Sequence, residues 1–104
     1  MVKSEILEEI LSAVSRETEI APERIASNDT TEEAVDARYI LVYMLHKKGF
    51  YASTIAPFIK HRKRSVNRIL SDFENRLSVS PIMRICLNRL ETNDYHIEGS
   101  RSAP

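Results

Sequence analysis

Residues 30–49, TTEEAVDARYILVYMLHKKG, decide the fold class of this chain. The middle of the stretch, Tyr39 to Leu45, is apolar on every side, so periodicity alone allows a buried strand or a buried helix. Both ends of the stretch favour a helix. Thr30 and Glu33 have the spacing of a capping box, and two lysines precede Gly49, as is typical of a helix end. The stretch therefore predicts one long, buried central helix.

Helical periodicity continues on both sides of this stretch. On the amino-terminal side, Ser4 precedes an amphipathic segment, and Pro22 suits the first position of a short helix. On the carboxyl-terminal side, Pro57 keeps a fourth helix short and Pro81 opens the last one. Residues 92–104 contain little to bury and are predicted to form a flexible tail. The predicted helices span residues 4–16, 22–26, 30–48, 53–59, 63–77 and 81–90.

The composition agrees with a small helical domain. With 104 residues, of which 42% are hydrophobic, the chain can form one core, which we place within residues 1–91. Two glycines and four prolines are too few for the frequent turns of a β-sandwich, and no alternation of strand and helix patterns indicates a parallel sheet. The expected fold class is all-α, a compact bundle of five or six helices.

Several function classes are excluded by what the sequence lacks. Gly49 and Gly99 lie fifty residues apart, so no glycine-rich loop is present to hold a nucleotide phosphate. Cys86 is the single cysteine, which excludes an internal disulfide and fits a reducing compartment. No apolar run approaches the ~20 residues of a membrane span, and residues 1–5 lack the apolar core of a signal peptide. We therefore expect a cytoplasmic protein with neither a membrane nor a nucleotide partner.

Neither a catalytic site nor a metal site is expected. His46, His61 and His96 do not have the spacing of metal ligands, and His46 is predicted to be partly buried on its helix. Cys86 lies among apolar residues and has no basic partner that would make it a nucleophile. Without paired carboxylates or a nucleophile–base pair, the chain is predicted not to be an enzyme and to need no cofactor.

The net charge of zero hides an uneven distribution of charge along the chain. Residues 1–36 hold ten acids and three bases, whereas residues 37–71 hold eight bases and no acid. Five of these bases fall within Lys60–Arg68, a segment that we call the basic cluster. Such a cluster attracts polyanions, above all the phosphates of nucleic acid. A solvated turn whose charges balance the acidic first third of the chain would have the same composition.

The basic cluster coincides with a helix-turn-helix pattern, in which a short helix and a tight turn precede a longer helix that starts with basic residues. In this geometry the amino end of the second helix enters the DNA major groove. Arginine suits guanine, asparagine suits adenine and small hydroxyls suit phosphates. The predicted bundle therefore contains a helix-turn-helix, with its recognition helix starting near Lys63. The predicted DNA-binding residues are Lys48, Lys60, His61, Arg62, Lys63, Arg64, Ser65, Asn67 and Arg68.

The order of these motifs resembles the C-terminal DNA-binding domain of the bacterial replication initiator DnaA. The resemblance covers about residues 6–91 and rests on three stretches: Asp36-Ala37-Arg38-Tyr39, Ser53-x-Ile55-Ala56 and Arg62-Lys63-Arg64-Ser65-Val66. Ser65 and Val66 match the Thr-Val of the family signature that opens the recognition helix. The resemblance implies a duplex-DNA partner and a role in replication initiation. It also implies that Arg38 is the family arginine that reaches the minor groove.

The chain departs from the family pattern at positions that read DNA. Tyr39 stands where the family has glutamine, and Arg62-Lys63-Arg64 replace its Asp-His-Thr. The turn is one residue shorter, so His61 or Arg62 takes the place of the signature arginine. The resemblance therefore implies the fold and a duplex partner but not the family's target sequence. The initiator's ATPase module has no counterpart in this sequence.

Three functions remain open at this point. The first is a duplex-DNA-binding module that acts in replication or as a small transcription regulator. The second is a helical interaction module whose basic face docks an acidic partner protein. The third is a single-strand or RNA binder that stacks bases on Tyr39, Tyr43, Phe50 and Tyr51. A single copy that reads one groove would bind weakly, so a second protein or a second copy of the chain is the further partner expected.

Overall fold

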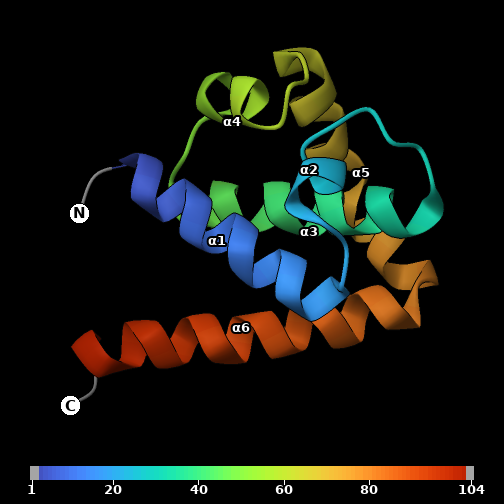
Figure 1. The fold of residues 1–104 in the computed structure, drawn as a ribbon. Helices are drawn as coiled ribbons and strands as arrows, with labels where there is room; N and C mark the ends of the chain where they lie inside the picture. The colour runs from blue at the N-terminus through green and yellow to red at the C-terminus, as the bar shows by residue number, and fades with distance from the viewer. Residues whose placement is uncertain (1–2, 103–104) are drawn as a thin grey trace.

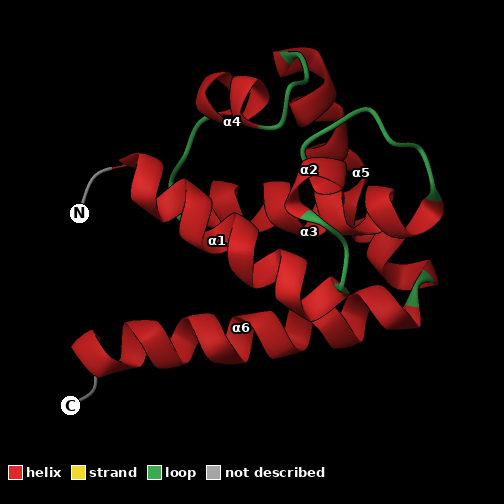
Figure 2. Ribbon diagram, viewed as in Figure 1, coloured by secondary structure: helices red, strands yellow, loops and turns green. Residues whose placement is uncertain are grey.

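The computed structural model describes the backbone of residues 3–102 and the side chains of residues 4–92. Over this range the chain forms six helices and no strand, which confirms the all-α fold class (Figures 1 and 2). The helices are α1 (Lys3–Thr18), α2 (Pro22–Ile25), α3 (Glu32–Lys47), α4 (Ala52–Phe58), α5 (Lys63–Val79) and α6 (Pro81–Ser102).

The centre of the bundle is α3, which contacts each of the other five helices. Figure 1 shows α1 crossing over α3, with α6 along one side of the pair and α4 on the other. Residues Tyr39 to Leu45 are buried except for the half-exposed Tyr43, whose ring stacks on that of Phe73 in α5 at a centroid distance of 4.1 Å. The prediction of a central helix that is apolar on every side is therefore confirmed.

The predicted capping box at the start of α3 is wrong. The residue at the N-cap is Thr31, not Thr30, and no side chain caps the helix amides there. The Thr31 hydroxyl instead donates a hydrogen bond to Asp29 Oδ1 at 2.8 Å and accepts one from Arg24 Nη2 at 2.9 Å. Because the loop before the helix uses this hydroxyl, it is not available to the helix amides.

The end of α3 is closed by backbone hydrogen bonds around Gly49, as the sequence predicted. The Gly49 amide donates to the His46 carbonyl, and the Phe50 amide donates to the Leu45 carbonyl. This pair of bonds is the Schellman arrangement, which needs a residue with positive φ after the helix. Gly49 supplies it with a φ of 102°, a conformation that residues with a Cβ rarely adopt.

Helix α6 is longer than predicted. We expected it to end near Leu90, with residues 92–104 as a tail, but the helix continues to Ser102. A helix satisfies its backbone hydrogen bonds locally, so it can extend past the last side chain that is buried in the core. The expectation of a tail was based on the lack of residues to bury, which does not by itself end a helix. Residues 103–104 lie outside the described residues.

Replacing Gly49 with alanine should destabilise the fold through backbone strain alone. A Cβ built at Gly49 meets nothing within 4 Å, so neighbouring atoms do not resist it, whereas the φ of 102° does. We expect Gly49→Ala to lower the free energy of unfolding by about 1–3 kcal/mol, as measured by urea denaturation. The exposed Ser12→Ala on α1 is the control and should change it by less than about 0.5 kcal/mol. Equal stability of the two variants would contradict the assigned turn.

Candidate nucleic-acid interface

Helix α4, the turn of residues 59–62 and helix α5 form one packed unit at the end of the bundle. The turn begins at Ile59, which is fully buried, as are Ile55 on α4 and Val66 on α5. Lys60 has a φ of 60°, and the following His61 amide donates to the Ala56 carbonyl at 2.9 Å. The buried aliphatic side chains hold the two helices together, and the left-handed residue reverses the chain tightly between them.

The cations of the basic cluster are exposed to solvent. The exposed members are Lys60, Arg62, Lys63, Arg64 and Arg68, together with Asn67, whereas Ser65 is half-buried. Within the described residues, no carboxylate forms an ion pair with any of these five cations. Their positive charge is therefore exposed to solvent and has no ion-pair partner among the described side chains.

The first two turns of α5 separate polar from apolar side chains. At 100° per residue, Lys63, Arg64, Asn67 and Arg68 fall within one arc of the helix. The buried Val66, Ile69 and Phe73 fall on the opposite side, where α5 packs against α3. This placement brings four predicted DNA-binding residues to one surface, next to the turn that carries Lys60 and Arg62.

His61 has a structural contact that the sequence did not indicate. Its ring is half-buried, and Nε2 lies 2.6 Å from the carbonyl oxygen of Ser27, in the loop between α2 and α3. Since a carbonyl only accepts, the ring must donate from Nε2. His61 thus anchors the turn to that loop with one ring nitrogen, which is no longer available to DNA.

Arg38 does not lie on the surface, contrary to the role implied by the resemblance. It is 4% exposed, and its guanidinium donates from Nε to the Ile25 carbonyl at 2.8 Å. Nη2 donates to the carbonyls of Arg24 and Asp29 at 3.1 and 2.9 Å. Burial lowers the pKa of Arg38. In this fold, Arg38 therefore fastens α2 and the loop after it to the central helix and does not reach toward a groove.

Replacing Arg38 should cost stability, unlike replacement of a surface cation. Arg38→Ala removes the side-chain donor from the carbonyl of the fully buried Ile25, and we expect the free energy of unfolding to fall by about 1–3 kcal/mol or more. The exposed Arg64→Ala should change it by less than about 0.5 kcal/mol. Thermal and urea unfolding of both variants measure the difference. If Arg38→Ala were as stable as the wild type, the assigned structural role would be wrong.

A second cluster of hydrogen bonds fixes the loop between α2 and α3. The Asp29 carboxylate accepts bonds from the Thr31 amide at 2.9 Å, from the Thr31 hydroxyl and from Arg24 Nε at 2.8 Å. The Thr31 amide and the Arg24 guanidinium hold the pKa of Asp29 well below its ordinary value. The bond to Asp29 in turn raises the pKa of Arg24. The turn-forming residues Ser27 to Thr30 indicated a loop here, but its arginine partners are known only from the structure.

Acid should weaken the fold through Asp29. Its pKa is lower in the folded state than the ordinary ~3.9, so its contribution is complete above that value and is lost as pH falls through the folded-state pKa. The Asp29→Asn variant should therefore lose less stability than the wild type between about pH 5 and pH 2. Urea unfolding at several pH values in this range measures the slope of the free energy of unfolding against pH. Glu8→Gln, an exposed change on α1, should keep the wild-type slope, and a wild-type slope in Asp29→Asn would contradict the role.

Most of the aromatic side chains proposed for base stacking are used inside the fold. Tyr39 is buried, and its hydroxyl donates a hydrogen bond to Asp72 Oδ2 at 3.1 Å. Burial is the main cause that raises the pKa of Tyr39, and the bond to Asp72 raises it further. Tyr43 stacks on Phe73, and Phe50 is buried. Tyr51, at the N-cap of α4, is 75% exposed. An aromatic platform of several rings therefore does not form at this surface.

The remaining candidate residues are not members of the basic cluster. Lys48 is half-buried at the C-cap of α3. His46 is exposed, so its predicted partial burial is wrong. Cys86 is half-buried, and burial together with the charge of Glu17 raises the pKa of its thiol. Among the described residues, no group of three or more histidine, cysteine or acidic side chains could hold a metal ion.

No helix in the described part of the chain combines the length and the hydropathy of a membrane span. Comparisons with protein-family models, with curated proteins and with solved structures found no match to this chain. Function is therefore inferred from the charges, exposure and contacts of the residues described above.

Proposed function

We propose that this chain binds double-stranded DNA through a helix-turn-helix formed by α4, the turn of residues 59–62 and α5. The observation that carries the proposal is the basic cluster, whose five exposed cations lie on the turn and the first two turns of α5 without carboxylate partners in the described residues. A surface of this kind attracts the closely spaced phosphates of a duplex. The amino end of α5 is then the part that enters the major groove.

The side chains near the start of α5 have distinct roles in this proposal. Arg64 and Asn67 are exposed one turn apart and have the hydrogen-bonding groups that read guanine and adenine edges. Lys60, Arg62 and Lys63 bind phosphates and fix the orientation of the helix on the duplex. The resemblance to the DnaA domain supports a role in replication initiation or as a small transcription regulator. Arg38 has no part in this contact because it is buried.

Selection of bound duplexes from a random pool tests the proposal. At about 150 mM salt, the chain should enrich a consensus sequence if α5 reads bases. Arg64→Ala and Asn67→Ala should each relax one position of that consensus, with a loss of about 1–3 kcal/mol of discrimination there. Arg16→Ala, an exposed change on α1, is the matched control and should leave the consensus unchanged. An unaltered consensus in Arg64→Ala would refute the assigned base contact.

The salt dependence of binding tests the phosphate contacts separately. With five or six contacts and a contribution of about 0.9 each, log K should fall with log salt with a slope near −5. Lys63→Ala should reduce the magnitude of that slope by about one. Binding to an acidic protein but not to any duplex would favour the alternative interaction module.

A further inference from the structure

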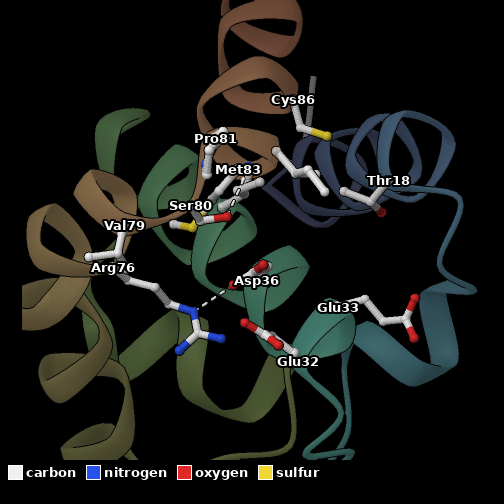
Figure 3. A pocket seen from close by; sticks show the side chains of 12 residues that line it. Thr18, Glu32, Glu33, Asp36, Arg76, Val79, Ser80, Pro81, Met83 and Cys86 are labelled. Atoms are coloured by element: carbon white, nitrogen blue, oxygen red, sulfur yellow. Dashed lines mark hydrogen bonds and ion pairs between the residues drawn. The ribbon is translucent and has the colours of Figure 1, made fainter.

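A groove lies at the corner where α5 ends and α6 begins, on a different part of the molecule from the basic cluster. It encloses about 560 Å³, and its apolar wall includes Val79, Pro81, Ile82, Met83 and Cys86. Figure 3 shows Val79, Pro81, Met83 and Cys86 around the corner, with Glu32, Glu33 and Asp36 of α3 on the other side of the groove. Val79 follows Arg64 by fifteen residues on the same helix, or about 22 Å along its axis.

The aliphatic side chains at this corner are unusually exposed. Val79 is 73% exposed, Ile82 is 72% exposed and Ile85 is 53% exposed. With Tyr51, they are the exposed large hydrophobic residues of the described part of the chain. Val79 and Ile82 line the groove, and Ile85 lies one turn after Ile82 on α6. Single exposed aliphatics are common on protein surfaces, but several at one groove are typical of an interaction site. We call Val79, Ile82 and Ile85 the apolar corner.

The opposite wall of the groove is acidic. Asp36 forms an ion pair with Arg76, at 2.5 Å between Oδ1 and Nε, so their charges offset each other (Figure 3). Glu32 and Glu33, in the first turn of α3, are exposed and form no ion pair within the described residues. The groove therefore combines an apolar wall with a net negative rim. This combination suits a positively charged amphipathic ligand.

We propose that this groove docks a basic amphipathic helix of a partner protein. Such a helix places apolar residues one turn apart against the apolar corner and directs lysine or arginine toward Glu32 and Glu33. Duplex DNA is disfavoured because its phosphates would meet these carboxylates. A two-fold pairing of two copies is disfavoured because it would bring two acidic rims together. The proposal does not depend on the DNA-binding function.

The arrangement lets one chain hold two ligands of different chemistry at once. The basic cluster and the groove lie toward opposite ends of α5, so neither ligand needs to displace the other. A partner bound at the groove would be brought next to whatever ligand the basic cluster holds. The groove thus provides recruitment of a second protein, independently of what the basic cluster binds.

A pair of designed peptides tests the chemistry of the groove. The first peptide is fluorescein-labelled, has about 18 residues, and carries leucine at helical spacing and lysine at the other positions. The second peptide is identical except that glutamate replaces each lysine. By fluorescence anisotropy with the full chain, the lysine peptide should bind at least about tenfold more tightly than the glutamate peptide. The single thiol of Cys86 lines the groove, so bound peptide should also slow its modification by a disulfide reagent.

Paired variants separate the groove from general surface effects. Ile82→Ser and the double change Glu32→Lys with Glu33→Lys should each weaken the lysine peptide at least about tenfold. The controls are Tyr51→Ser, and Glu8→Lys with Glu9→Lys, which alter equally exposed residues elsewhere and should leave binding unchanged. All these positions are exposed, so unchanged helicity by circular dichroism is expected. Equal loss in the control variants, or no loss in the groove variants, would overturn the proposal.

Sedimentation equilibrium of the chain alone tests the competing occupant. A monomer across the concentration range supports a heterologous partner. Dimers that dissociate in Ile82→Ser would show that a second copy covers the corner, and would overturn the proposal. Duplex binding is measured on the same samples, so failure of the groove proposal is distinguished from failure of the proposed DNA-binding function.

Discussion

The three hydrogen bonds from Arg38 to the carbonyls of Arg24, Ile25 and Asp29 connect the central helix to the segment that anchors the turn between α4 and α5. They fasten α2 and the loop after it to the central helix. That loop in turn offers the Ser27 carbonyl to His61, which anchors the turn before α5. The turn before α5 is thus connected to the central helix through a chain of polar contacts. Buried polar contacts of this kind specify one arrangement because an unpaired carbonyl is costly.

Several acidic and basic side chains lie on separate parts of the surface and do not pair with one another within the described residues. The ion pairs within the described residues, such as those of Arg24 with Asp29 and Arg76 with Asp36, join acidic and basic residues away from the start of α5. The cations of the basic cluster stay exposed, while two glutamates stay exposed at the groove beside α6. A neutral chain therefore presents two surfaces of opposite character. This separation underlies both the proposed contact with DNA and the proposed docking of a basic helix.

The positions of the helices followed from local patterns, whereas the errors had different physical causes. The capping box failed because Asp29 and Arg24 engage Thr31, the residue that occupies the N-cap. Helix α6 continued past Leu90 because backbone bonding needs no buried side chain. The resemblance placed Arg38 at the DNA surface, but the residue is buried. Its position directly before the apolar run from Tyr39 to Leu45 is a local sign of this burial. Its acceptors lie nine to fourteen residues away, beyond any local pattern.

The sequence alone determined the all-α class, the central helix, the glycine at its end and the concentration of bases in the turn before α5. These properties depend on residues within one or two helical turns, so they can be read locally. The tertiary structure decided which arginine is buried, which tyrosines are enclosed in the core, and where aliphatic and acidic side chains meet in a groove. These properties depend on residues far apart in the chain, which come together only when the helices pack.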